Sequence, residues 1–196
     1  MHELLWAQID KLEGNATAKR AICTFDSELC TYTVLLLGDE FIVNAATRSI
    51  YRADQSDKQA GFLEQLCVLA YLINASDIPV TGRLVGADKL DSGQFFFRGP
   101  HMLPTARLEE VFGEEPALLN DAGDILAAKR CEYGDTSIEI EVLPRLSIVI
   151  VIWAKDDEFD ARASILFDET ADKQLPLDAL GAGVQLAVTL VINCLD

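Results

Sequence analysis

Alternation of apolar and polar residues is clearest in the last third of the chain, where it predicts a sheet. In 136–143, Ile138, Ile140 and Val142 share one face, and polar or acidic residues occupy the other, which is typical of a strand. The uninterrupted apolar run 146–153 predicts a strand that is covered on both faces. A Pro-Arg corner separates these two segments, and 162–167 predicts a further strand.

The first third of the chain predicts helices around a small sheet. Apolar residues fall on one face of 1–13, which predicts an amphipathic helix. Segments 30–37 and 40–44, with a short strand at 49–52, predict a meander because the β-rich runs are separated by turn residues. Segment 57–74 is apolar on most sides and predicts a largely buried helix.

The middle of the chain is less regular and is punctuated by glycine. The three phenylalanines at 95–97 predict a short strand. Thr105 is a candidate N-cap for a helix to Phe112, with Gly113 at its C-terminal end, and Pro116 can open another helix to about residue 130.

The final helix is expected to begin at about Pro176, and 179–195 carries no formal charge. Its length is at the low edge for a membrane span. Gly181, Gln185, Thr189 and Asn193 form a narrow polar or small stripe along it. We therefore favour a buried core helix, or one at a subunit interface, over a membrane anchor.

Runs of strands beside segregated helices favour an α+β fold class. We expect mixed or antiparallel sheets with packed helices and a largely buried C-terminal helix. With 196 residues and no evident linker or repeat, the chain is interpreted as one domain over 1–196.

Composition narrows the choice of partners. A hydrophobic fraction of 50% is enough to bury a core. The net charge of −16 repels phosphate backbones and anionic lipid surfaces, so nucleic-acid and membrane roles are not expected.

The five cysteines form no CxxC motif, and an odd number of thiols is typical of a reducing compartment. The alternative is a ligand or reactive thiol, for which Cys23 and Cys30 are the pair of interest. The first thirteen residues contain early acids and no apolar core of a signal peptide, so we expect a cytoplasmic protein.

The first candidate site is the segment FFFRGPHMLP at 95–104. His101, whose imidazole can act as an acid, a base or a metal ligand, follows a rigid Gly-Pro break, and Arg98 can bind a carboxylate or phosphate through its planar fork. The functional hypothesis is a small anion or metal site. The alternative is a loop histidine bonded to backbone and an arginine paired with one of the many acids.

The second candidate is acidic. Asp157 and Glu158 lie in a turn between two predicted strands, together with Asp156 and Asp160. Hard cations prefer such oxygen clusters, but the spacing does not fit a calcium loop. Asp168 follows a buried run and can be either a capping group or a site residue. His101, Asp157 and Asp168 are the candidate metal ligands.

No Gly-rich phosphate loop, HExxH, GxSxG or four-cysteine cluster is present, so the sequence indicates no particular cofactor or reaction.

Several stretches together resemble the domain-of-unknown-function family 3786, a family of bacteria and archaea, mostly anaerobes. Similar motifs in the family are the Leu-Pro-Arg corner at 143–145, the strand ending in Trp153, the acidic turn, the ILFD strand end at 165–168 and the LPLD helix start at 175–178. NASDIP at 74–79 and FFRGPHMLP at 96–104 also match.

The resemblance selects Arg98, His101, Asp157, Glu158 and Asp168 as residues on matched motifs, and implies an association with anaerobic redox or cofactor metabolism. This chain lacks the cysteine cluster that some relatives carry for an iron–sulfur centre.

Three hypotheses follow. The first is a binding or accessory protein for a small molecule, cofactor or metal. The second is an enzyme in which Arg98 clamps an anionic substrate, His101 is the general acid or base, and Asp157 or Glu158 assists. The third is an interaction module or homodimer through the C-terminal helix. The enzyme hypothesis requires His101 to lie near one of these carboxylates.

Overall fold

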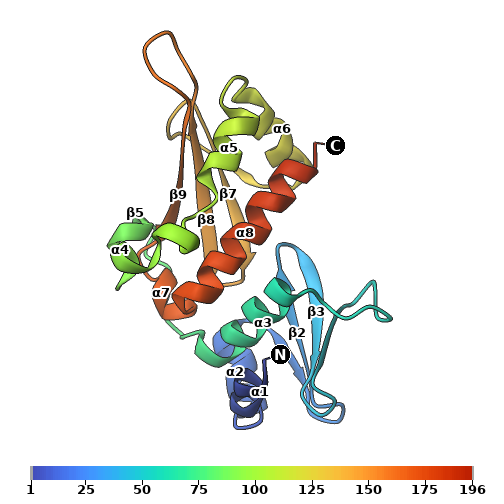
Figure 1. The fold of residues 1–196 in the computed structure, drawn as a ribbon. Coiled ribbons are helices and arrows are strands. Elements are labelled where there is room, and N and C mark those ends of the chain that lie inside the picture. Colours follow the sequence, from blue (N-terminus) through green and yellow to red (C-terminus); the bar gives the residue numbers. More distant parts are fainter. Residues whose placement is uncertain (1, 196) are drawn as a thin grey trace.

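The chain forms two antiparallel sheets with a pair of long helices between them (Figure 1). The computed structural model describes residues 2–195. The first sheet has the order β1-β2-β3-β4, and the second has the order β5-β9-β8-β7-β6. Helices and antiparallel sheets together confirm the predicted α+β class. The strands are β1 (Thr24–Asp26), β2 (Thr31–Leu36), β3 (Asp39–Asn44), β4 (Ser49–Arg52), β5 (Leu84–Gly86), β6 (Lys129–Cys131), β7 (Thr136–Leu143), β8 (Leu146–Trp153) and β9 (Arg162–Asp168).

One face of the first sheet is buried. Tyr32, Val34 and Leu36 alternate with more exposed residues along β2, as expected for a sheet with one covered face. The N-terminal helices and the first long helix pack beside this sheet, in the lower part of Figure 1. These helices are α1 (Glu3–Ile9), α2 (Gly14–Ala21) and α3 (Phe62–Asn74).

The second sheet buries an aliphatic inner face under helices from the C-terminal half (Figure 1). Ile138 on β7 lies opposite Ile150 on β8, which lies opposite Ile165 on β9. The helices of this half are α4 (Gly93–Phe96), α5 (Thr105–Phe112), α6 (Ala117–Ile125), α7 (Ala171–Gln174) and α8 (Leu177–Asn193), with two 3-10 turns, η1 (Ala87–Lys89) and η2 (Gly99–His101).

The two halves meet along α3 and α8. A Cβ at Gly183 of α8 would lie 3.2 Å from Val142 of β7 and 3.7 Å from the Cys67 sulfur of α3, so this position brings three elements together. The Leu37 N–H, just after β2, donates to the Val142 carbonyl oxygen at 2.9 Å and joins the two sheets directly. The buried side chains of both halves form one cluster.

The C-terminal helix is largely buried, as predicted, with Ala179, Leu180, Val184, Ala187 and Val188 inside. Along its polar or small stripe, Gln185 and Asn193 are exposed, whereas Gly181 and Thr189 are half-buried. Among residues 2–195, no helix combines the length and the apolar character that crossing a membrane requires.

Several predicted helix boundaries are wrong. The predicted helix over 1–13 ends at Ile9, and the separate helix α2 follows, capped by the Glu13 carboxylate. The helix predicted from residue 57 begins at Phe62, where Glu64 reaches back to the Gly61 N–H. Thr105 is the first helical residue of α5 rather than its N-cap, while Gly113 does end that helix.

Two segments change type. The predicted strand at 95–97 is instead the end of α4, which packs so closely on η1 that a Cβ at Gly93 would lie 1.9 Å from the Ala87 carbonyl oxygen. The helix predicted to residue 130 ends at Ile125, and Lys129–Cys131 forms the edge strand β6. The extended conformation of this short polar segment results from its pairing with β7, because its own residues do not favour a strand.

Candidate functional site

The FFFRGPHMLP segment forms two short turns and separates two adjacent cavities. Gly99 has a φ of +55°, a backbone conformation that glycine adopts without strain, and Pro100 continues it into η2. The two cavities share Met102 and Leu103 as a common wall. Arg98 lines one cavity and His101 lines the other.

The Arg98 cavity has a volume of about 370 Å³. One wall of the cavity is the first half of β9. The strand β5 pairs only with Leu166–Asp168, so the first half of β9 has no partner strand on the β5 side. Phe97, Met102 and Leu103 contribute apolar side chains to the lining, and Ser164 adds a hydroxyl group. No side chain among residues 2–195 forms an ion pair or hydrogen bond with the Arg98 guanidinium.

An acid also lines this cavity. Asp88 belongs to η1, and its carboxylate is 3.1 Å from the Lys89 ammonium, so its charge is partly compensated. The Arg98 guanidinium therefore keeps its donors available to a ligand.

The His101 cavity is smaller, at about 180 Å³. The imidazole stacks on the Phe96 ring, with centroids 4.7 Å apart and an angle of 28° between the planes. Asp178 and Gln185 enter the same cavity from α8. Sequence reasoning missed these two residues because they lie far along the chain and carry no local motif.

Asp168 is a buried anchor for the loop between α3 and β5. One carboxylate oxygen accepts hydrogen bonds from Thr81 N, Thr81 Oγ1 and Gly82 N, and the other accepts from Thr170 N and Thr170 Oγ1. Burial raises the pKa of this carboxyl, but these hydrogen bonds outweigh that effect and hold the pKa below its usual value. These contacts are those of a capping group, which is one of the two roles expected for Asp168.

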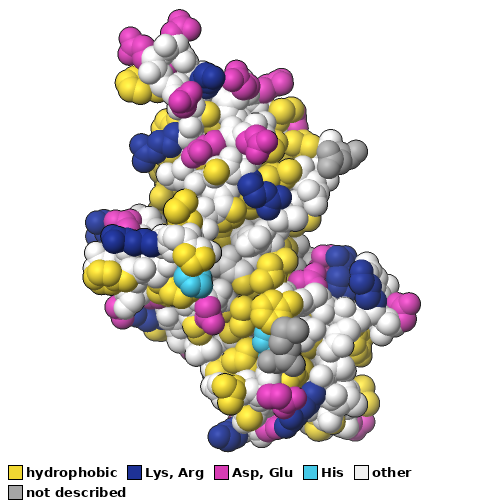
Figure 2. Space-filling view, viewed as in Figure 1, with side chains coloured by type: hydrophobic (Ala, Val, Ile, Leu, Met, Phe, Trp, Pro, Cys, Tyr) yellow, Lys and Arg dark blue, Asp and Glu magenta, His cyan; other side chains and the backbone are white. Residues whose placement is uncertain are grey.

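The acidic turn lies at the opposite end of β9, in the long orange loop of Figure 1. Asp156 organises it by accepting the N–H groups of Glu158 and Phe159 at 2.8 and 2.7 Å. Asp157 and Glu158 are exposed, and Figure 2 shows acidic side chains at the tip of this loop. The Lys155 ammonium approaches Asp160 at 3.9 Å and supplies local positive charge.

The structure brings Arg98 and His101 into neighbouring cavities but does not bring the acidic turn to them. Asp168 and the acidic turn are separated by the length of β9, which is about 20 Å at the usual strand rise. Neither the Arg98 cavity nor the His101 cavity is lined by Asp157, Glu158 or Asp168. Within residues 2–195, no three His, Cys, Asp or Glu side chains lie close enough together to hold a metal ion.

The five cysteines are all free thiols. Cys67 is fully buried, its sulfur lies 3.4 Å from the Ala179 carbonyl oxygen, and burial raises its pKa to about 12. Burial also raises the pKa of Cys23 to about 11. Cys30 lies exposed in the turn before β2.

We expect thiol reagents to distinguish these residues in the folded protein. At pH 8, Cys30 should be alkylated by N-ethylmaleimide within minutes, while Cys67 should react only after unfolding, because it is buried and almost entirely protonated. Peptide mass mapping of timed samples measures the order of modification, with a urea-unfolded sample as the control. Early modification of Cys67 would contradict the packing of α3 against α8.

Comparison with known proteins matches the chain to a protein family. The model of a family described as a domain of unknown function, DUF3786, matches residues 14–189. No curated protein and no solved structure matches the chain.

Proposed function

Because the chain belongs to the DUF3786 family of domains of unknown function, we propose its role from the geometry alone: it binds a small organic anion in the Arg98 cavity. The ligand class is a carboxylate or phosphate that carries an apolar group. The role is that of a binding or accessory protein.

The observation that supports this proposal is the unpaired guanidinium at the cavity. The chain carries 32 acidic and 16 basic side chains, so an arginine near a surface would be expected to find a carboxylate partner. Arg98 has no such partner among residues 2–195 and lines a hollow instead. A planar guanidinium can bind both oxygens of a carboxylate or phosphate.

The other residues that line the Arg98 cavity indicate which groups the rest of the ligand should carry. Phe97, Met102 and Leu103 offer apolar surface, and Ser164 and Thr105 provide hydroxyl groups beside it. A concave site with mostly apolar walls and a few convergent polar groups is typical of small-molecule sites. His101 lies in the next cavity, so it can contact a ligand only if that ligand extends past Met102 and Leu103.

The test compares two ligands of nearly equal shape that differ in charge. Benzoate should bind in the millimolar range, and benzamide should bind about tenfold more weakly, since it lacks the charge that Arg98 recognises. The R98Q variant should lose this preference. Amide chemical-shift changes in NMR titrations measure both affinities and locate the site, which should include residues 97–105 and 163–166.

The matched control is R83Q, which changes an exposed arginine that already pairs with Glu169 at 3.2 Å. It should leave benzoate binding unchanged. Equal binding of benzoate and benzamide, or equal loss in R98Q and R83Q, would contradict the proposal.

A further inference from the structure

The outer face of the second sheet holds a separate feature, an ion pair between two cavities. Lys129 on β6 and Glu139 on β7 are direct cross-strand partners, and their charged atoms are 3.0 Å apart. A cavity of about 380 Å³ lies beside them, and a second cavity of about 220 Å³ does too. Both cavities are also lined by Ser147 of β8. None of these residues lines the Arg98 cavity.

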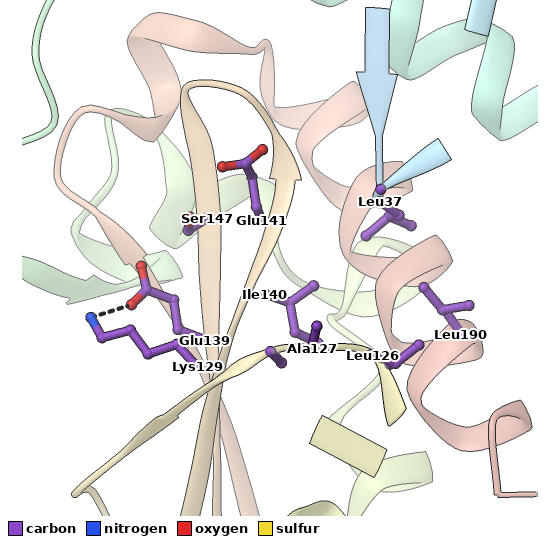
Figure 3. Close-up of a pocket in the computed structure, with 11 residues that line it drawn as sticks. Leu37, Leu126, Ala127, Lys129, Glu139, Ile140, Glu141, Ser147 and Leu190 are labelled. Atoms are coloured by element: carbon purple, nitrogen blue, oxygen red, sulfur yellow. Dashed lines mark hydrogen bonds and ion pairs between the residues drawn. The ribbon is translucent and has the colours of Figure 1, made fainter. Parts of the chain in front are cut away.

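Figure 3 shows the larger cavity, where the dashed line joins Lys129 to Glu139. Its other side is apolar and comes from three parts of the chain: Leu37 after β2, Leu126 after α6 and Leu190 of α8. Glu141 contributes a second carboxylate from β7. The ion pair and Glu141 thus form the polar side of this cavity, and the three leucines form its apolar side.

The smaller cavity is the more enclosed hollow on this face. Its apolar lining consists of Leu84 of β5, the buried Val149 of β8 and Val80, and Val80 and Gly82 come from the loop that Asp168 anchors. Val149 lies directly opposite Glu139 in the register of β7 and β8. The apolar lining and the ion pair are thus immediate neighbours across the strands.

The ion pair is open to replacement. The Lys129 side chain is 77% exposed and that of Glu139 is 31% exposed, so water already competes for both groups and the pair itself contributes little to stability. A ligand that supplies both charges can take the place of each partner without leaving either group uncompensated.

The charges around the pair select the ligand. Lys129 is the only cationic side chain in the lining of either cavity, whereas Glu139, Glu141 and Asp168 are acidic. A simple anion would displace Glu139 from Lys129 and leave that carboxylate facing Glu141. A simple cation would leave Lys129 without a partner. A zwitterion satisfies both.

We propose that this face binds a zwitterionic α-amino acid with an aliphatic side chain. Its carboxylate contacts the Lys129 ammonium, its ammonium contacts the Glu139 carboxylate, and its side chain enters the smaller cavity beside Leu84 and Val80. This site shares no lining residue with the anion site proposed at Arg98.

The experiment titrates L-leucine and three analogues into the full chain by NMR. Leucine should bind below about 10 mM, while N-acetyl-leucine, which lacks the ammonium, and isoamylamine, which lacks the carboxylate, should each bind at least about tenfold more weakly. Glycine should also bind weakly, because it has no side chain to fill the smaller cavity beside Leu84 and Val80. Shifted amides should include 80–84, 129–133 and 147–149.

K129Q and E139Q should each weaken leucine binding about tenfold, whereas K155Q should not, because Lys155 belongs to a different exposed ion pair with Glu114. Unchanged thermal unfolding of K129Q confirms that the variant is folded. Absence of leucine binding below about 10 mM, equal binding of N-acetyl-leucine, or an unchanged affinity in K129Q would each overturn the proposal.

Discussion

Replacing Asp168 by alanine should lower the free energy of unfolding by about 3 kcal/mol at pH 7, among the largest effects of any polar substitution in this chain. The carboxylate accepts five hydrogen bonds, three of them from backbone N–H groups. Alanine leaves these donors without an acceptor, in a site where the side chain is 9% exposed. Asparagine should cost less, because it keeps one oxygen.

The effect should depend on pH in a defined direction. The folded-state pKa of Asp168 is lowered from 3.8, since the bonds from Thr170, Gly82 and Thr81 outweigh the effect of burial. A lowered folded-state pKa contributes stability above the unfolded pKa, and this contribution is lost as the pH falls through the folded-state pKa. The difference between the native protein and D168N should therefore shrink below about pH 4.

Urea unfolding at pH 7 and pH 3 measures this difference. D135N is the matched control, since the exposed Asp135 carboxylate accepts one backbone bond, from Ala154 at 2.7 Å, and its loss should cost less than about 1 kcal/mol. A gap between native protein and D168N that stays constant from pH 7 to pH 3 would show that the charge is not the source of the stabilisation.

Replacing Arg145 by methionine should cost about 3 kcal/mol of unfolding free energy. The side chain is 13% exposed and projects from the turn between β7 and β8. It donates to the Arg20 carbonyl oxygen at 2.6 Å, to the Ile78 carbonyl oxygen at 3.3 Å and to Asp77 at 2.5 Å. One guanidinium thus joins α2, the loop after α3 and the second sheet.

R145K should recover little of the lost unfolding free energy, because a single ammonium cannot reach the three acceptors that the planar guanidinium of arginine contacts. R48M is the control. Arg48 pairs with Glu3 and Asp10 at 2.9 and 2.7 Å, but it is 43% exposed, so its loss should cost less than about 1 kcal/mol. Thermal unfolding followed by circular dichroism compares the variants, and similar losses in R145M and R48M would contradict this role of Arg145.

Arg145 and Asp168 both belong to conspicuous sequence motifs, and their hydrogen bonds indicate a structural role for those motifs. The Leu-Pro-Arg corner, the NASDIP stretch and the ILFD strand end are far apart in sequence, yet Arg145 and Asp168 both bond to the loop over 75–83. Gln174, fully buried, accepts the Ser76 N–H in the same region. Within these three stretches, the bonds of Arg145 and Asp168 serve the architecture of the fold.

The strands were predictable where the local pattern is strong. Segments 136–143 and 146–153 match β7 and β8 to the residue, because alternation and an unbroken apolar run are local signals on either side of a Pro-Arg turn. The strand β6 was missed since Lys129 and Arg130 are polar and only their pairing with β7 makes them extended. The strand predicted at Phe95–Phe97 was wrong. Aromatic residues favour strands, but the packing of α4 on η1 makes this segment helical.

The candidate site was predictable only in part for the same reason. Arg98 and His101 stand out in the sequence through residue type and the neighbouring Gly-Pro break. Asp178 and Gln185 reach the His101 cavity from α8, and Glu139 meets Lys129 across ten residues, so no local pattern marks them. Long-range packing creates these neighbours.

The Leu37–Val142 bond between the two sheets bears on how the chain folds during synthesis. The first sheet and α3 emerge from the ribosome long before β7, and α3 must wait for α8, whose Ala179 carbonyl oxygen accepts from Cys67. Loops of such length close slowly, so the side of α3 that packs on α8 stays uncovered in the nascent chain until α8 has been synthesised. During that interval the uncovered apolar side chains of α3 make the nascent chain prone to aggregation.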